Sequence, residues 1–333
     1  MITQQINPVL IIGATGIIGS RAITALRTLQ PDLPLVLASR GIEETKALAK
    51  EIGNATAVEV DLHKDTLGLS DSLQFSALAI FLKDNGLNSL KYAQTKRIPY
   101  MDISSAVFEI GPEVALYTQA QHAAPVLMNS NWLAGTSTLM AINFTKQFKT
   151  IDSITVSALL DEQDIGGKAA AADYERQTQA VTSALVMQDG LWRWLNGTDK
   201  KGVFSDVGGN QIASEAFSNM DVLSLAVATD ATNVRFEFAV GKTTARRMGK
   251  HFSHEIIITI TGTGVDDVIR TVRHEIVHPE GQAPMTALSA AIAIERLAGL
   301  KDGAVKPGLY MPHQLIDPAY LLTHLRQIGT TVD

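Results

Sequence analysis

The sequence predicts an α/β protein in which a doubly wound parallel sheet is followed by an α+β domain with a mostly antiparallel sheet. Three observations lead to this fold class. A strand-like segment runs into a glycine turn and a helix at residues 9–29. Short apolar runs then alternate with helical segments up to residue 128, as in a parallel sheet with crossover helices. From Ile151 onward, strand-like segments alternate apolar and polar residues, which is typical of antiparallel sheets with one wet face.

The first strand and turn carry the clearest functional signal. Val9–Ile12 is a short apolar run, and an Ala/Leu-rich helix is predicted over Ser20–Leu29. A strand, a glycine turn and a helix form the dinucleotide-binding arrangement of the Rossmann fold. The first glycine makes the tight turn, the second lets the backbone approach a pyrophosphate and the third lets the helix approach the strand, while the anion sits at the helix N-terminus. The predicted cofactor-binding residues here are Gly13, Ala14, Thr15, Gly16, Ile17, Ile18 and Gly19.

The end of the second strand predicts which dinucleotide is preferred. Leu35–Ala38 is apolar and is followed by Ser39 and Arg40, with no acidic residue before Glu43. An NAD-selective site places a carboxylate here to bind the ribose 2′-hydroxyl. A guanidinium suits a 2′-phosphate instead. Ser39 and Arg40 therefore predict NADP(H) in preference to NAD(H); the alternative is that Arg40 is a solvated loop residue.

The rest of the first domain continues the strand and helix alternation. Ligands of doubly wound sheets bind beyond the carboxyl ends of the strands. At the end of the third strand, Asp61 and Leu62 are predicted neighbours of the adenine, although Asp61 could equally cap the segment that follows. The predicted strands are 57–60, 75–82, 97–102 and 123–128, and the predicted helices are 43–53 and 87–96.

Three polar residues are predicted at the nicotinamide end of the site. Lys83 follows the fourth strand, Asp102 ends the fifth and Asn131 follows the sixth. Each is a candidate catalytic residue for proton delivery or substrate orientation. Tyr92 and Lys96 match the Tyr-x-x-x-Lys pair of short-chain dehydrogenases, but that pair follows the fifth strand in that family, so an ordinary helix position is preferred.

The second domain is predicted to contain a sheet of at least four strands. These are 154–160, 234–240, 255–261 and 271–278, with a helix predicted over 169–187. Trp192 and Trp194 are interpreted as packing residues. Pro284–Leu297 is a strongly apolar helix, and Asp317-Pro318 opens a final helix with an acidic cap. The predicted domains are residues 1–130, 131–280 and 281–333, the last being helices that pack back on the first.

One segment is unusually basic. Between the strands that end at residue 241 and begin at residue 255, the chain concentrates Arg246, Arg247 and His251. These residues are predicted to bind the substrate by clamping a carboxylate; a solvated hairpin is the equal alternative. His274 and His278 show no metal-ligand spacing, so no metal is predicted.

The length, net charge and residue composition of the chain exclude several classes of protein. A chain of 333 residues fits two domains, and its net charge of −6 argues against a general nucleic-acid binder. The absence of cysteine excludes disulfides and thiolate chemistry. The sequence shows neither a secretory signal nor an apolar run long enough to span a membrane. We expect a cytoplasmic protein with a small-molecule substrate and no nucleic-acid or membrane partner.

These motifs together resemble the saccharopine dehydrogenase-like group of NADP(H) oxidoreductases over most of the chain. The similarity rests on the glycine turn, Ser39-Arg40, Tyr100-Met-Asp102 where the family has Tyr-x-Asp, His122, and the helix after Pro284. Two active-site loops depart from the family. Leu82-Lys83-Asp84 stands where Gly-Pro-Phe is common, and Asn131-Trp132-Leu-Ala-Gly135 stands where a Gly-Phe-Asp-x-x-Pro run is common.

The resemblance implies hydride transfer between NADP(H) and a C=N or C=O carbon of a small carboxylated metabolite. The altered loops leave a second class open, an NADP(H)-binding redox sensor without catalysis. A reductase of the atypical short-chain type is a third possibility, if Tyr92 and Lys96 face the nicotinamide. The half-wet sheet of the second domain is compatible with a homodimer, which we expect.

Overall fold

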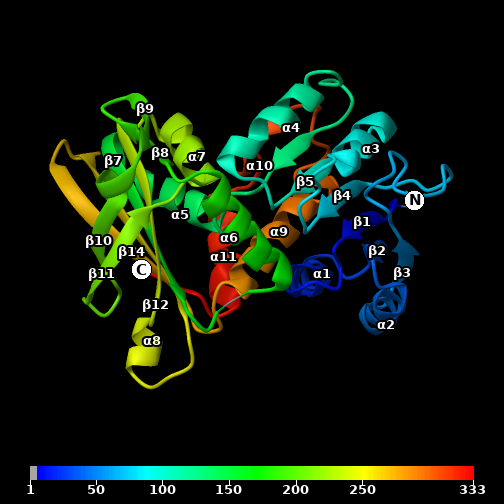
Figure 1. Cartoon of the computed structure of the whole chain (residues 1–333), viewed down its shortest axis with the longest axis horizontal. Coiled ribbons are helices and arrows are strands. Elements are labelled where there is room, and N and C mark those ends of the chain that lie inside the picture. Colours follow the sequence, from blue (N-terminus) through cyan, green and yellow to red (C-terminus); the bar gives the residue numbers. More distant parts are fainter. Residues whose placement is uncertain (1–5, 165) are drawn as a thin grey trace. The chain divides into compact units, whose positions relative to one another are not determined.

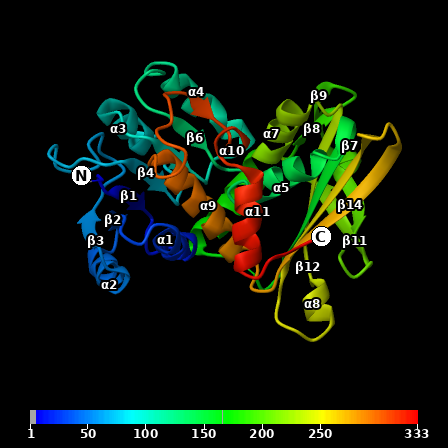
Figure 2. The same cartoon turned by 180° about the vertical axis from the view of Figure 1, so that it is seen from behind.

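The chain divides into two compact units in a computed structural model that describes residues 6–164 and 166–333. The first unit comprises the residues up to Ser130 together with Ala287–Leu315. The second comprises Asn131–Thr286 and Ile316–Asp333. Figures 1 and 2 draw the chain from opposite sides.

The first unit is built on a parallel sheet, as predicted. Within the described residues it has seven strands in the order β3-β2-β1-β4-β5-β6-β15, and every neighbouring pair is parallel. The strand order reverses between β1 and β4, which is where such sheets bind their ligands. The strands are β1 (Val9–Ile12), β2 (Leu35–Ser39), β3 (Ala55–Glu59), β4 (Ala77–Ile80), β5 (Tyr100–Asp102), β6 (Val126–Met128) and β15 (Leu309–Tyr310).

Helices cover both faces of this sheet. Figures 1 and 2 show α1 and α2 on one side of the strands and α3 and α4 on the other. Burial on both faces explains why β1, β2 and β4 are continuous apolar runs that are buried throughout. The helices are α1 (Ile17–Leu29), α2 (Ile42–Ile52), α3 (Asn88–Lys96), the 3₁₀ turn η1 (Val107–Glu109), α4 (Ile110–Tyr117) and α10 (Pro312–Leu315), and α9 (Ala283–Leu297) joins them from Ala287 onward.

Three strands of the first unit, β4, β5 and β6, are shorter than predicted, and proline explains where the last two begin. β5 starts directly after Pro99 and β6 directly after Pro125. A proline has no N–H to give to the ladder. Its carbonyl still accepts, from Leu78 N at 2.8 Å for Pro99 and from Tyr100 N at 3.0 Å for Pro125.

The second unit contains a mixed, mostly antiparallel sheet. Its described strands follow the order β10-β11-β12-β7-β13-β14-β16, and β8 pairs with both β12 and β9. β12 is antiparallel to β11 but parallel to β7. The alternation of apolar and polar residues in its sequence predicts an antiparallel strand and therefore does not predict the parallel pairing with β7. The strands are β7 (Phe148–Asp161), β8 (Ala184–Gln188), β9 (Leu191–Leu195), β10 (Lys201–Ser205), β11 (Gln211–Ala216), β12 (Asn233–Gly241), β13 (His254–Gly264), β14 (Ile269–His278) and β16 (Thr331–Val332).

The helix predicted over 169–187 is wrong in its last third. The helix ends at Ala180, and β8 follows. Asp189 and Gly190, with φ angles of 52° and 73°, turn the chain back into β9. Trp192 and Trp194 on β9 are 44% and 48% exposed, so they are not core packing residues. The helices of this unit are α5 (Thr136–Thr145), α6 (Lys168–Ala180), the 3₁₀ turn η2 (Gly197–Lys200), α7 (Met220–Thr229), α8 (Thr244–Arg247) and α11 (Pro318–Gln327).

The C-terminal segment divides between the two units. The predicted cap is confirmed, because Asp317 Oδ1 accepts a hydrogen bond of 3.0 Å from the Ala319 N–H at the start of α11. α11 packs on α5, and β16 pairs with β14. Residues 287–315 therefore group with the first unit and Ile316–Asp333 with the second. No helix in the described part of the chain is long and apolar enough to cross a membrane.

Candidate functional site

The glycine turn after β1 has the geometry that its sequence predicts. Gly13 has a φ of +85°, and its N–H and that of Ala14 donate to Ala38 O at 2.9 and 3.2 Å. A Cβ on Gly13 would lie 3.3 Å from the Cβ of Phe81. A Cβ on Gly19 would lie 2.2 Å from Gly13 O, so only glycine lets α1 come this close to the turn.

The N-terminus of α1 is open to an anion. Gly16 is the N-cap and provides no side chain, and the first turn contains no acidic residue. The N–H groups of Ile17, Ile18 and Gly19 have no carbonyl partner within the helix. Thr15, Gly16 and Ile17 are exposed at this end. Free N–H groups and the positive end of the helix dipole together favour a phosphate here.

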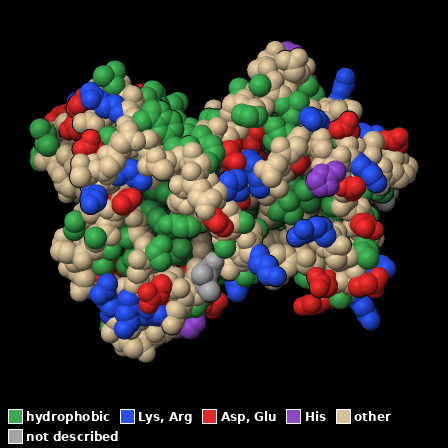
Figure 3. Space-filling model, viewed as in Figure 1, with side chains coloured by type: hydrophobic (Ala, Val, Ile, Leu, Met, Phe, Trp, Pro, Cys, Tyr) green, Lys and Arg blue, Asp and Glu red, His purple; other side chains and the backbone are tan. Residues whose placement is uncertain are grey.

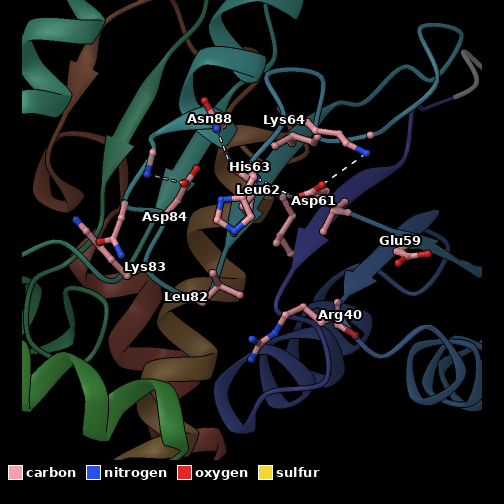
Figure 4. Close-up of a pocket in the computed structure, with 17 residues that line it drawn as sticks. Arg40, Glu59, Asp61, Leu62, His63, Lys64, Leu82, Lys83, Asp84 and Asn88 are labelled. Atoms are coloured by element: carbon pink, nitrogen blue, oxygen red, sulfur yellow. Dashed lines mark hydrogen bonds and ion pairs between the residues drawn. The ribbon is translucent and has the colours of Figure 1, made fainter.

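A cavity of about 830 Å³ lies at the carboxyl ends of β1 to β4. Ile12, which directly precedes the glycine turn, lines it. Figure 4 shows the side chains that the strand ends and the loop after β4 send to its wall. Five of the predicted site residues line this one cavity, namely Ser39, Arg40, Asp61, Leu62 and Lys83.

Arg40 and Ser39 differ in what they can offer a ligand. Arg40 is exposed, and among the described residues its guanidinium has no hydrogen-bond or ion-pair partner. In Figure 4 this guanidinium points away from Glu59. The Ser39 hydroxyl is buried and lies 2.5 Å from Thr45 Oγ1, so it orders the start of α2. Of these two residues, Arg40 therefore offers a charged group that is free within the described part of the chain.

The loop after β3 is held by its own polar groups. Asp61 Oδ1 accepts from the His63 N–H at 2.9 Å, and this hydrogen bond lowers the pKa of Asp61. The alternative that Asp61 caps the following segment is thus what the structure shows, although Asp61 also lines the cavity. Asn88 Nδ2 donates to Leu62 O at 2.7 Å and ties this loop to α3.

A buried group of charges surrounds two of the predicted catalytic residues. Lys83 Nζ lies 3.1 Å from Ser105 Oγ, 3.3 Å from Glu109 Oε2 and 3.5 Å from Glu113 Oε1. Ser105 Oγ lies 3.0 Å from Asp102 Oδ2 and also contacts Glu113 Oε1. We name these five residues the carboxylate cluster. It lies beyond the carboxyl ends of β4 and β5, within the first unit.

Burial controls the titration of the carboxylate cluster. It raises the pKa of Asp102, against the opposing effects of the Ser130 hydroxyl and Lys83. It also raises the pKa of Glu113 to about 7, and repulsion by Asp102 adds to this while Ser105 and Lys83 oppose it. Carboxyls with perturbed pKa values cluster at functional sites.

The sequence alone predicts only part of the carboxylate cluster. Lys83 and Asp102 are among the predicted catalytic residues, whereas Ser105, Glu109 and Glu113 are not. Glu109 and Glu113 are four residues apart, which places them on one face of a helical segment. That spacing directly after the fifth strand is the signal that could have identified them.

Asn131, the third predicted catalytic residue, belongs to the second unit. Its Nδ2 donates to Thr138 Oγ1 and to Ser224 Oγ, each at 2.9 Å. Both donor protons of the side-chain amide are therefore used inside this unit.

The basic segment around α8 is largely neutralised. Figure 3 shows blue side chains gathered at the tip of the second unit that carries α8, with red ones among them. Arg246 pairs with Asp161 at 3.1 Å and also with Glu162. Arg247 Nε lies 3.6 Å from Asp206 Oδ2. His251 Nδ1 lies 3.2 Å from Phe252 O.

The Tyr92 and Lys96 pair does not form a proton-delivery site. Tyr92 is 3% exposed and packs in the hydrophobic core of the first unit. Lys96 Nζ is paired with Asp71 at 2.7 Å on the surface.

In the second unit, His274 stacks on Phe144 with ring centroids 3.8 Å apart.

Comparison with known proteins identifies the fold. No model of a known protein family matches the sequence, and no curated protein matches it. The structure is similar to that of saccharopine dehydrogenase (L-Glu forming) from Saccharomyces cerevisiae, with a TM-score of 0.69 and 12% identity over 98% of this chain and 100% of that chain. It is also similar to a myo-inositol dehydrogenase from Corynebacterium glutamicum, with a TM-score of 0.51 and 12% identity over 98% of this chain and 99% of that one.

A myo-inositol 2-dehydrogenase from Lactobacillus plantarum gives the same TM-score of 0.51 at 9% identity, again over 98% of this chain and 99% of that chain. At such identities the likeness establishes the fold alone. The chain has the fold of Rossmann-type dehydrogenases, and the expected resemblance to saccharopine dehydrogenase is confirmed at that level.

Proposed function

We propose that this protein is an NADP(H)-dependent oxidoreductase that transfers a hydride to or from a C=N or C=O carbon of a small metabolite. The observation that carries this proposal is the pairing, in one unit, of an uncapped α1 N-terminus behind Gly13 with Arg40 at the end of β2, whose guanidinium has no partner among the described residues. The first feature suits a pyrophosphate and the second a 2′-phosphate.

The chain's own residues fit such a cofactor. The N–H groups of Ile17 and Ile18 would hold the pyrophosphate, and Arg40 the 2′-phosphate. A bound NADPH would supply the hydride from its nicotinamide C4. In a sheet of this order the nicotinamide half lies toward β4, β5 and β6, which is the side where Lys83 and Asp102 lie. A carboxylate clamp by Arg246 and Arg247 is not included, because both already face carboxylates.

The second candidate is an NADP(H)-binding redox sensor without catalysis. Such a protein needs the dinucleotide site but no proton donor. The carboxylate cluster favours the enzyme, since burying three carboxyls beside one lysine costs stability without a structural gain, whereas a proton donor near the nicotinamide needs such groups.

Titration of the purified protein with NADPH and with NADH, followed by cofactor fluorescence, tests the proposal. We expect Arg40→Ala to weaken NADPH binding roughly 10- to 100-fold, because one charge-assisted contact is lost, and to leave NADH binding unchanged. Lys50→Ala removes an exposed cation from neighbouring α2 and serves as the control. Wild-type protein that binds neither nucleotide would overturn the proposal.

A further inference from the structure

We propose that Glu113 stores the proton consumed in the reductive reaction and that Ser105 passes it to Lys83. This inference rests on the proposed function. It assigns a role to two residues that no motif in the sequence identifies, and it starts from the geometry of the Ser105 hydroxyl.

Counting protons at this hydroxyl shows that the carboxylate cluster holds an extra one. Ser105 Oγ contacts three groups, namely Lys83 Nζ, Asp102 Oδ2 and Glu113 Oε1. A hydroxyl has one proton and two lone pairs, and an ammonium can only donate. If both carboxyls were ionised, the hydroxyl would have to donate to both with a single proton. One carboxyl is therefore protonated and donates to the serine oxygen.

The surroundings select Glu113 as the protonated group. Asp102 Oδ1 accepts from the Ser130 hydroxyl at 3.0 Å, and its Oδ2 accepts from Ser105, so two donors stabilise its ionised form. Glu113 has no such second hydroxyl donor among the described residues, and its side chain is only 5% exposed. Burial then raises the pKa of Glu113 to about 7, which agrees with the proton count.

Every charged or titratable group that faces Glu113 is part of this balance. Lys83 comes from the loop after β4, Asp102 and Tyr100 come from β5, and Glu109 comes from η1. With Glu113 protonated, one cation faces two carboxylates. Ionising Glu113 adds a third carboxylate around the same cation, which is why its proton is released near neutral pH.

The path leads from the buried carboxyl to the cavity. Lys83 lines the cavity of about 830 Å³, whereas Glu113 does not. Hydride addition to a C=N or C=O carbon leaves the electron pair of the broken π bond on nitrogen or oxygen, and Lys83 supplies the proton that this atom needs. The Ser105 hydroxyl then turns its proton toward the neutral amine and gives it up, the serine oxygen takes the proton of Glu113, and a proton taken up from the solvent later restores Glu113. One proton is consumed in each turnover.

Side-chain titration in protein labelled with ¹³C only at the glutamate carboxyls tests the proposal without a substrate. We expect one resonance to titrate near pH 7, instead of near the ordinary glutamate value of 4.5, and to be missing in Glu113→Gln. Glu51→Gln, an exposed residue of α2, should leave the resonance unchanged.

The labelling separates Glu113 from Asp102, so the wild-type protein alone shows whether a glutamate stays protonated, even if a variant folds poorly. The proposal is overturned if no glutamate titrates above pH 6, or if the high resonance persists in Glu113→Gln. NADPH binding is measured on the same samples and should be unchanged in Glu113→Gln. If the wild-type protein does not bind NADPH, the proposed function fails. The titration of the glutamate resonance tests the stored proton separately, because it needs no cofactor.

Discussion

The Gly19→Ala variant is expected to lose NADPH binding by roughly 100-fold or more and to lower the free energy of unfolding of the first unit by about 1–3 kcal/mol. The added Cβ would lie 2.2 Å from Gly13 O and 3.0 Å from Gly13 C, which are backbone atoms that cannot rotate away. α1 must therefore shift, and its N–H groups move with it. Alanine is the better helix former, so a net loss of stability reports the clash itself.

Far-ultraviolet circular dichroism during urea unfolding, together with NADPH titration, measures both effects. All three tryptophans lie in the second unit, so their fluorescence shows whether that unit is still folded. Gly241→Ala adds the same methyl group where the nearest atom is 3.8 Å away, and it should change neither quantity appreciably. If Gly19→Ala binds NADPH as tightly as the wild type does, α1 does not hold the cofactor.

Raising the pH from about 4.5 to about 7 is expected to cost the first unit about 3 kcal/mol of stability through Glu113 alone. The pKa of Glu113 is about 7 in the folded chain, whereas an unfolded chain has the ordinary glutamate value of 4.5. The folded state therefore binds more protons between these two pH values. Its contribution is fully present below pH 4.5 and is lost as the pH rises through 7. Each pKa unit corresponds to about 1.4 kcal/mol.

The pH dependence of the urea midpoint, compared between the wild type and Glu113→Gln, isolates this contribution. Groups that do not interact with Glu113 titrate alike in both proteins and cancel in the difference. The wild type should lose stability relative to Glu113→Gln across the window. Parallel pH profiles would mean that folding does not raise the pKa of Glu113, which contradicts the stored proton.

Much of the first unit, and the start of α11 in the second, could be predicted because the signals are local. The apolar run of β1 is buried on both faces, and its predicted bounds match the structure. Gly19 is needed because α1 passes close to the carbonyl oxygen of Gly13, six residues earlier. The cap at Asp317 depends on the N–H of Ala319, two residues later. In each case the residues that interact are near neighbours in the sequence.

The incorrect predictions have other causes. β8 is a short apolar run that fits a helix or a strand equally well, and only the Asp189-Gly190 turn that follows it decides between them. Arg246 looks like a free cation in the sequence because its partner Asp161 is far away along the chain. The carboxylate cluster likewise depends on topology, since Lys83 and Glu113 meet only when β4 and β5 are neighbours.

A crystal structure of the protein soaked with NADP⁺ would show directly whether α1 and Arg40 hold the cofactor. We expect pyrophosphate oxygens within hydrogen-bond distance of the Ile17 and Ile18 N–H groups and the 2′-phosphate against the Arg40 guanidinium. A nucleotide bound elsewhere, or no nucleotide at a saturating concentration, would contradict the proposed function.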